Sequence, residues 1–265
     1  MSMRYLTLYR RCLGAHLRAV LEYQADFCIL VVAGIVTQCL GLVFLGTVFT
    51  RIPSLHGWRL PELVLLYALV GLTQAAVTLF SDGIWFLNHA LHTGEFDYRL
   101  VRPYPPVLQM MSTQIGFSGV GDLLASLALL VWALLHLHLH LSPLRAAACL
   151  VLAASAVVTR IAIVVAANAS AFWIGSPSPT FATAVHSIGE LSRYPLSIYG
   201  LGLRLFITVV LPFGFAGFLP ASWILGRTDG YARLGLLSPA VALLTAGLAY
   251  ALFQRGLRRY ESAGH

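Results

Sequence analysis

The sequence contains no lysine, and all 17 of its basic residues are arginines. A P-loop needs a lysine to hold the terminal phosphates of a nucleotide, and Schiff-base chemistry needs a lysine amine, so both are excluded. Charge of either sign is scarce, at 10% of 265 residues, against about 25% in a typical soluble domain. Hydrophobic residues make up 58%, and the mean hydropathy is +0.81. Because one protein interior cannot hold so much apolar surface, the composition predicts a membrane protein.

Cysteine is also scarce. Three of the four cysteines lie in apolar runs and Cys12 lies in a basic segment, so no pair in a loop indicates a disulfide framework. The net charge of +7 does not indicate nucleic-acid binding, because the arginines are scattered between apolar stretches and do not cluster on one face. In a membrane protein, arginines near span ends set the orientation instead.

Six apolar stretches are long enough to cross a bilayer, which takes about 20 mostly apolar residues per helix. They cover residues 27–49, 62–80, 114–137, 146–173, 198–218 and 235–253. Polar segments that contain proline or glycine separate them. The sequence therefore predicts an all-α polytopic membrane protein with six transmembrane helices, forming a single transmembrane domain over residues 1–265.

The arginines near the span ends predict the orientation. With both termini in the cytoplasm, ten of these arginines lie inside and five outside, and positively charged loops tend to stay cytoplasmic. Residues 3–25 precede the first span, and Arg4, Arg11 and Arg18 share one stripe of a helix there, opposite an apolar face. This pattern predicts an amphipathic cytoplasmic helix in contact with membrane lipids. A plain extension of the first span is the alternative.

The expected cytoplasmic stretch 91–106 carries charges of both signs and ends in prolines. Carboxylates, guanidinium groups and aromatic rings alternate along it, and aromatic residues and arginine are frequent at interface hot spots. The stretch is therefore predicted to be a docking segment, with a solvated loop as the alternative. Its candidate docking residues are Gly94, Glu95, Phe96, Asp97, Arg99, Arg102 and Pro103.

Residues 94–103 resemble the G-x-hydrophobic-D-x-x-L-x-R-P signature of exporter-type (type-2) ABC transporter permeases. The resemblance is closest to the six-span branch, whose genes usually encode two different permeases beside one ATPase. It continues at Phe172-Trp173, at Tyr194-Pro195-Leu196 and in the stretch 211–221. Tyr104 departs from the pattern, since a small or aliphatic residue is expected at that position.

The resemblance implies a permease without ATPase chemistry in a bacterial cytoplasmic (inner) membrane. The N-terminal helix and segment 91–106 would dock onto a separate cytoplasmic ABC ATPase, present in two copies, which would bind the ATP and Mg²⁺. No cofactor would be bound by this chain. A second six-span permease, a different protein, would complete the translocation path. Residues 212–226, which include Pro212 and Pro220, would form an external re-entrant helical segment between the fifth and sixth spans.

Two charges lie within the expected spans at similar depth, Asp122 in the third and Arg160 in the fourth. A lone charge at mid-membrane costs at least ~2.5–3.5 kcal/mol on insertion scales, so pairing is expected. The sequence favours an Asp122–Arg160 ion pair. Arg204 is a competing partner for the carboxylate, and a role in lining the substrate path is a further alternative.

Histidines alternate at His136, His138 and His140, at the outer end of the third expected span. On a helix, alternate residues point in different directions, so these side chains are not expected to bind a metal ion together.

Two other functions remain open from the residues alone. His92 and Asp97 form an H-x-x-x-x-D pattern, a spacing used by membrane acyltransferases, in which a carboxylate orients a histidine base. No second acyltransferase motif accompanies it. A self-sufficient secondary transporter would be expected to show inverted repeats and several midplane carboxylates, and neither is evident. The cargo is not named by the sequence, although apolar spans suit a hydrophobic or amphipathic molecule.

Overall fold

The computed structural model describes Tyr5 and residues 7–12, 14–15, 24–137, 139, 142–227 and 230–261. Within this part of the chain the regular structure is helical, apart from one isolated bridge between Leu55 and Trp58. The all-α prediction is therefore confirmed for the described residues. The long helices are α2 (Gln24–Phe49), α3 (Leu60–Ser81), α7 (Ser118–Leu137), α8 (Pro143–Ala169) and α14 (Ser238–Arg259).

Short helices connect the long ones. After α3 come η1 (Asp82–Phe86), α4 (Leu87–His92), α5 (Asp97–Leu100) and α6 (Pro106–Met111). After α8 come α9 (Ala171–Ile174), α10 (Thr180–Glu190), η2 (Leu191–Arg193), η3 (Leu196–Ile198), α11 (Leu201–Leu205), the π-helical turn η4 (Phe206–Val210), η5 (Pro212–Ala216), α12 (Phe218–Ile224) and α13 (Tyr231–Gly235).

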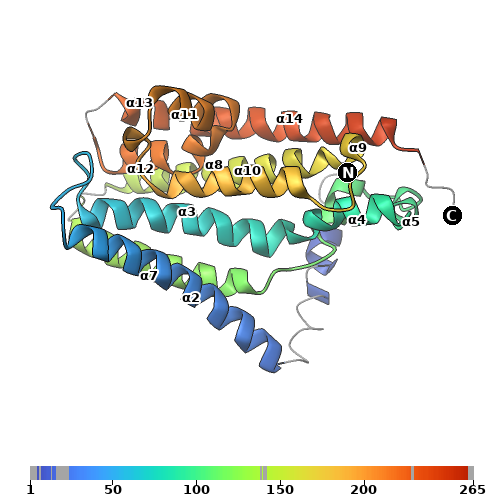
Figure 1. Cartoon of the computed structure of the whole chain (residues 1–265), viewed down its shortest axis with the longest axis horizontal. Helices are drawn as coiled ribbons and strands as arrows, with labels where there is room; N and C mark the ends of the chain where they lie inside the picture. The colour runs from blue at the N-terminus through green and yellow to red at the C-terminus, as the bar shows by residue number, and fades with distance from the viewer. Residues whose placement is uncertain are drawn as a thin grey trace.

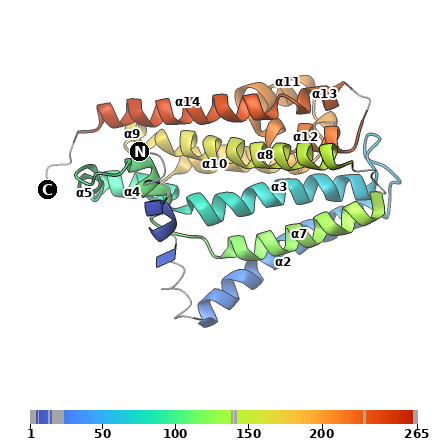
Figure 2. The same cartoon turned by 180° about the vertical axis from the view of Figure 1, so that it is seen from behind.

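The long helices form a bundle with nearly parallel axes (Figure 1). From one side to the other, the layers are α14, then α8 with α10, then α3, then α7 with α2, and the reverse view gives the same order (Figure 2). The described N-terminal residues, α4, α5, α9 and the end of α14 gather at one end, here called the terminal end. Helices α11 to α13 gather at the opposite end. Because α3 lies in the middle, most of its residues are buried.

Sequence signals set where the long helices begin. Prolines stand in the first turn of α3, α8 and α14, where the missing N–H costs no helical hydrogen bond. The Ser142 hydroxyl oxygen accepts a hydrogen bond from the Arg145 amide at 3.3 Å and caps α8. At α3, the Arg59 amide donates to the Glu62 carboxylate at 3.0 Å, as in a capping box.

Five helical segments in the described residues are long and apolar enough to cross a membrane. These segments are Gln24–Phe49, Leu60–His92, Ser118–Leu137, Pro143–Ile174 and Ser238–Arg259. They coincide, within a few residues at most ends, with the first, second, third, fourth and sixth expected spans. The chain is thus consistent with a polytopic membrane protein.

The fifth expected span, 198–218, is not one continuous helix. It is divided into η3, α11, η4, η5 and the start of α12, with extended backbone at Leu211 before Pro212. Proline lacks the N–H that would continue the helix, and the glycines in this stretch add conformational freedom. After α8, the segment that packs along the bundle is the eleven-residue helix α10, which lies beside α8 (Figure 1). A search for about 20 consecutive apolar residues passes over α10 because that helix is too short and partly polar.

The amphipathic helix expected over residues 3–25 lies only partly in the described residues, which are helical at 5, 7–12 and 14–15. Arg4 and Arg18 lie outside them. Of the described side chains, Arg10 and Arg11 are exposed. Tyr9 donates its hydroxyl to the backbone carbonyl of Phe80, so this segment contacts the bundle near the end of α3.

Helices α2 and α7 approach closely because each has a glycine against the backbone of the other helix. A Cβ atom at Gly34 would collide with the Ser118 carbonyl oxygen, and one at Gly121 would collide with the Val31 carbonyl oxygen. Small residues of this kind let membrane helices pack backbone to backbone.

Gly34→Ala is therefore expected to lower the free energy of unfolding by about 1–3 kcal/mol, since the two backbones must separate. Gly46→Ala is the matched control, because it lies on the same helix with no atom near the added Cβ. The control should be neutral or slightly stabilising, because alanine favours helix over glycine. Denaturation of both purified variants in one detergent would measure the difference. Equal stability of the two variants would contradict the close packing.

Candidate functional site

The docking segment 91–106 folds back on itself at the terminal end. Gly94 has φ +75°, a left-handed conformation that glycine adopts without strain, and it ends the turn after α4. Phe96 is fully buried. Its ring packs edge-on against Phe172 of α9 at 5.8 Å and against Tyr260 at 5.3 Å between centroids. One aromatic side chain thus fixes the segment to α9 and to the end of α14.

Beyond this anchor, the segment presents an exposed tip. Tyr98 is 74% and Val101 83% exposed, and Glu95, Arg102 and Pro103 are exposed as well. Asp97 and Arg99 are half-buried. Burial and the Asp97 carboxylate together raise the pKa of Tyr260 to about 12, which places Asp97 beside the C-terminal end of α14. The segment therefore combines a buried anchor with a projecting surface of mixed charge and apolar side chains.

A buried glutamine, Gln109, holds the second half of the segment in place. The Gln109 amide nitrogen donates to the backbone carbonyls of Arg99 at 2.9 Å and Tyr104 at 2.6 Å. Tyr104, the residue that departs from the expected pattern, packs its ring 5.9 Å from that of Tyr5. Burial raises the pKa of Tyr104 to about 12, so the phenol stays protonated. This tyrosine joins the segment to the N-terminal residues.

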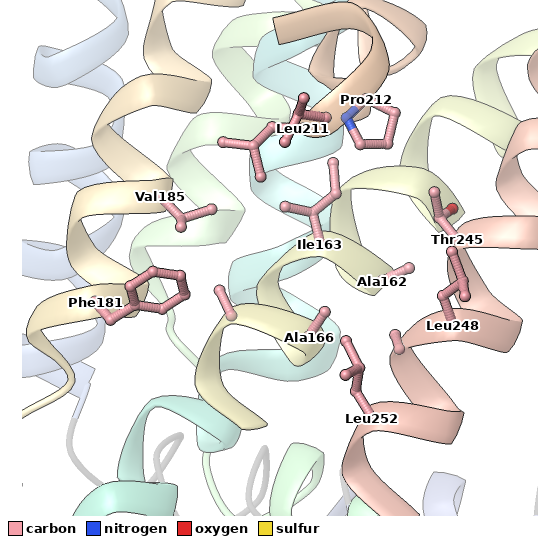
Figure 3. Close-up of a pocket in the computed structure, with 13 residues that line it drawn as sticks. Ala162, Ile163, Ala166, Phe181, Val185, Leu211, Pro212, Thr245, Leu248 and Leu252 are labelled. Carbon is pink, nitrogen blue, oxygen red and sulfur yellow. The ribbon is translucent and has the colours of Figure 1, made fainter. Parts of the chain in front are cut away.

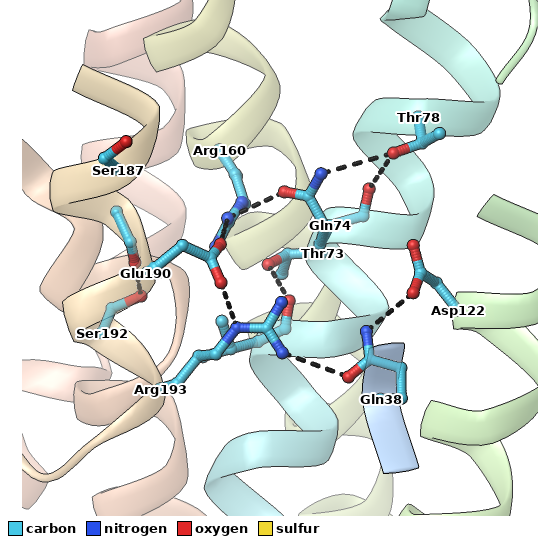
Figure 4. A network of polar contacts seen from close by, with 12 residues as sticks. Gln38, Thr73, Gln74, Thr78, Asp122, Arg160, Ser187, Glu190, Ser192 and Arg193 are labelled. Atoms are coloured by element: carbon cyan, nitrogen blue, oxygen red, sulfur yellow. Dashed lines mark hydrogen bonds and ion pairs between the residues drawn. The ribbon is translucent and has the colours of Figure 1, made fainter. Parts of the chain in front are cut away.

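A second polar site lies inside the bundle (Figure 4). Arg160 of α8 is fully buried and donates from Nη2 to Glu190 Oε1 and to Gln74 Oε1, each at 2.8 Å. The other Glu190 oxygen pairs with Arg193. Arg193 Nη1 donates to Gln38 Oε1 at 3.1 Å. The network therefore joins α2, α3, α8 and α10.

The network ends at Asp122 of α7, whose Oδ1 accepts from the Gln38 amide at 2.9 Å. Asp122 and Arg160, which the sequence favoured as a pair, do not contact each other. They are linked through Gln38, Arg193 and Glu190. The reason is positional, because α3 packs between α7 and α8 and separates the two charges.

Glu190 is the partner of Arg160 that the sequence pattern missed. It lies at the end of α10, which is outside every expected span. The sequence did contain one signal for this partner. The chain has only ten acidic residues, and a buried arginine needs a carboxylate partner, so the candidates were few.

Arg204, the competing partner for Asp122, has other contacts. Its guanidinium donates to the backbone carbonyls of Leu196 at 3.1 Å and Tyr199 at 2.9 Å, and to the Tyr231 hydroxyl at 2.6 Å. These bonds fix the Arg204 side chain to the turn at residues 196–199 and to α13.

The short helices 196–235 meet at the end opposite the termini (Figure 1). Pro212 begins η5, and Pro220 is buried within α12. Phe213 and Phe218 are fully buried, and the ring of Phe213 lies 5.8 Å below the Arg160 guanidinium. The broken helices are therefore packed against the polar network.

The histidine cluster is only partly described. His136 stacks on Trp132 at 4.2 Å and its Nδ1 lies 2.8 Å from the Trp132 carbonyl oxygen. His138 and His140 lie outside the described residues. In the part of the chain that the structure covers, no group of three histidine, cysteine or acidic side chains is arranged to hold a metal ion.

Comparison with protein families identifies the chain. A family model described as "ABC-2 family transporter protein" matches residues 35–264. The chain belongs to this ABC-2 transporter family. No curated protein and no solved structure matches it significantly. The resemblance seen in residues 94–103 is thereby confirmed at the level of the family.

Membership has direct consequences for the chemistry. ABC-2 membrane permeases carry no ATPase domain of their own and partner with ABC ATPases, which agrees with the absence of lysine and hence of a P-loop in this chain. The chain is a multi-pass ABC-2 membrane permease. A self-sufficient secondary transporter and an acyltransferase, both left open by the residues, are not what this family contains.

Proposed function

We propose that the chain is the permease subunit of an ATP-driven exporter in a bacterial cytoplasmic membrane, with both termini in the cytoplasm. It forms the translocation path with a second, different six-span permease and is driven by two copies of a cytoplasmic ABC ATPase that bind ATP and Mg²⁺. The cargo is a hydrophobic or amphipathic molecule.

The exposed tip of segment 91–106 carries the proposal. A loop that only connected two helices would not need a fully buried anchor at Phe96 beneath exposed Tyr98 and Val101. Rigid anchoring lowers the entropic cost of binding, because fewer groups are immobilised when the partner arrives. Glu95 and Arg102 add charges of both signs at the rim, which select the partner and its orientation.

The two other sites have roles in the same mechanism. The polar network links α10 with α2, α3 and α8, so a movement started at the terminal end reaches several helices together. Helices η5 and α12, with Pro212 and Pro220, form the proposed external re-entrant segment and cap the path at the opposite end.

The test is purification of the tagged full-length chain from its native membranes in mild detergent, with mass spectrometry of the proteins recovered. Glu95→Ala/Arg102→Ala is expected to reduce recovery of a P-loop ATPase at least about tenfold, since two rim contacts to a partner are lost. His92→Ala is the matched control, because His92 is exposed at the same end but precedes the tip.

Each outcome decides between functions. Recovery of the ATPase with a second six-span protein, both kept in His92→Ala, supports the exporter. Full recovery in Glu95→Ala/Arg102→Ala would contradict docking at the tip. Loss of cellular function in His92→Ala while the ATPase stays bound would favour histidine chemistry instead.

A further inference from the structure

An apolar groove runs along the bundle between α10 and α14, with α8 as its floor (Figure 3). Its volume is ≈ 260 Å³. Phe181, Leu248 and Leu252 at its rim are exposed, so the groove opens to the surroundings of the bundle. Among the described residues that line it, only Thr245 has a polar side chain, and its hydroxyl donates to the Val241 carbonyl at 2.8 Å. The single polar side chain therefore has its hydroxyl hydrogen bonded within α14, and the rest of the wall is apolar, so the groove suits a hydrocarbon occupant.

The groove runs along α14 toward the arginines at the C-terminal end of that helix. Thr245, Leu248 and Leu252 form a row along that helix in steps of three and four residues, and the same steps continue to Arg255 and Arg259. From Thr245 to Arg255 is ten residues, or about 15 Å at 1.5 Å per residue. That length is about half of the ~30 Å hydrocarbon core of a bilayer. The apolar row thus has the length of one leaflet and ends in arginine.

Positive charge is in excess at that end, where Arg255, Arg258 and Arg259 stand near a single glutamate, Glu261. Arg255 and Arg259 are exposed, and no ion pair to either is formed within the described residues. Arg259 also lines a polar hollow of ≈ 270 Å³ together with His92, Ser176 and Glu261. An occupant whose hydrocarbon part lies in the groove would therefore bring its polar part to two free guanidinium groups, which bind phosphate well.

We infer that this groove binds an acyl chain of an anionic phospholipid from the leaflet at the terminal end, with the lipid phosphate held by Arg255 and Arg259. The apolar wall has the length of one leaflet and ends in positive charge. A lipid with an anionic headgroup therefore fits the groove better than a purely apolar molecule does. Arginines near the membrane surface add about 1 kcal/mol each to the binding of anionic lipid. The site is separate from the proposed docking tip and goes beyond the proposed function.

The test is native mass spectrometry of the full-length chain in detergent, titrated with phosphatidylglycerol or with phosphatidylcholine of the same acyl chains. Phosphatidylglycerol is expected to form the stronger one-lipid adduct. Arg255→Gln/Arg259→Gln should weaken it about fivefold for each arginine removed. Arg233→Gln is the control, because Arg233 is an exposed arginine on α13, at the opposite end of the bundle (Figure 1).

A second pair of variants locates the acyl chain. Ala166→Leu fills the groove, whereas Ala153→Leu makes the same change, on the same helix, in a different apolar groove of ≈ 310 Å³ between α3, α7 and α8. Only Ala166→Leu should reduce the adduct, and both variants should keep the same melting temperature.

Several results would overturn the inference. Equal binding of the two lipids, or equal loss in Arg233→Gln, would contradict a role for Arg255 and Arg259. Equal loss in Ala153→Leu would show that the acyl chain does not lie in this groove. A wild-type chain with no lipid adduct would show that the lipid site does not exist. The assay measures binding alone, so its outcome is independent of whether the chain exports anything.

Discussion

Glu190→Ala is expected to lower the free energy of unfolding by about 2 kcal/mol, because the fully buried Arg160 loses its carboxylate partner. The loss is below that of a fully buried ion pair, since the Glu190 side chain is 36% exposed and partly screened by solvent. Glu190 holds both Arg160 and Arg193. Without it, Arg160 keeps only the Gln74 carbonyl oxygen as a partner among the described residues, and two guanidinium groups remain close together. Thermal or SDS-induced unfolding of the purified chain would measure the loss.

A double variant separates pairing from a general defect. Arg160→Met in the Glu190→Ala background should restore more than half of the lost stability, since an apolar side chain of similar length removes the unpaired charge. Glu261→Ala, at an exposed position, should change stability by less than about 0.5 kcal/mol. If Arg160→Met instead adds its own full loss to that of Glu190→Ala, the two residues act independently and the ion pair has no energetic role.

Phe96→Ala is expected to cost about 3–5 kcal/mol locally, the range for deleting a buried phenylalanine ring. The ring contacts Phe172 and Tyr260, so its loss should detach segment 91–106 from α9 and α14. Trypsin should then cut after Arg99 faster than in the wild type. Recovery of the partner ATPase should fall as well, even though every exposed residue of the tip is unchanged.

Phe86→Ala is the control for this variant, because Phe86 lies near the same end and is 43% exposed. It should leave the rate of trypsin cleavage unchanged. Cleavage after Arg99 at the wild-type rate in Phe96→Ala would show that the backbone turn at Gly94 and the Gln109 hydrogen bonds hold the segment without the ring.

The expected spans agree with the structure where a helix is long, apolar and bounded by proline or polar residues, as in α3, α8 and α14. Agreement fails at 198–218, where hydropathy is high but Pro212 and the nearby glycines interrupt the helix. It fails again at α10, whose eleven residues are too few for a full crossing. Average hydropathy measures the preference of a stretch for an apolar environment, but it carries no information about helix continuity.

The sequence alone determined that this chain is a helical membrane protein without a P-loop, because apolar content and the absence of lysine do not depend on how the chain folds. It also showed the family signature in residues 94–103, since the residues of that signature are contiguous. Tertiary structure decided the partner of Arg160, the separation of Asp122 from it, and the alignment of an apolar groove with Arg255. These depend on which helices are neighbours, and α3 between α7 and α8 is a consequence of packing the whole bundle that no local pattern contains.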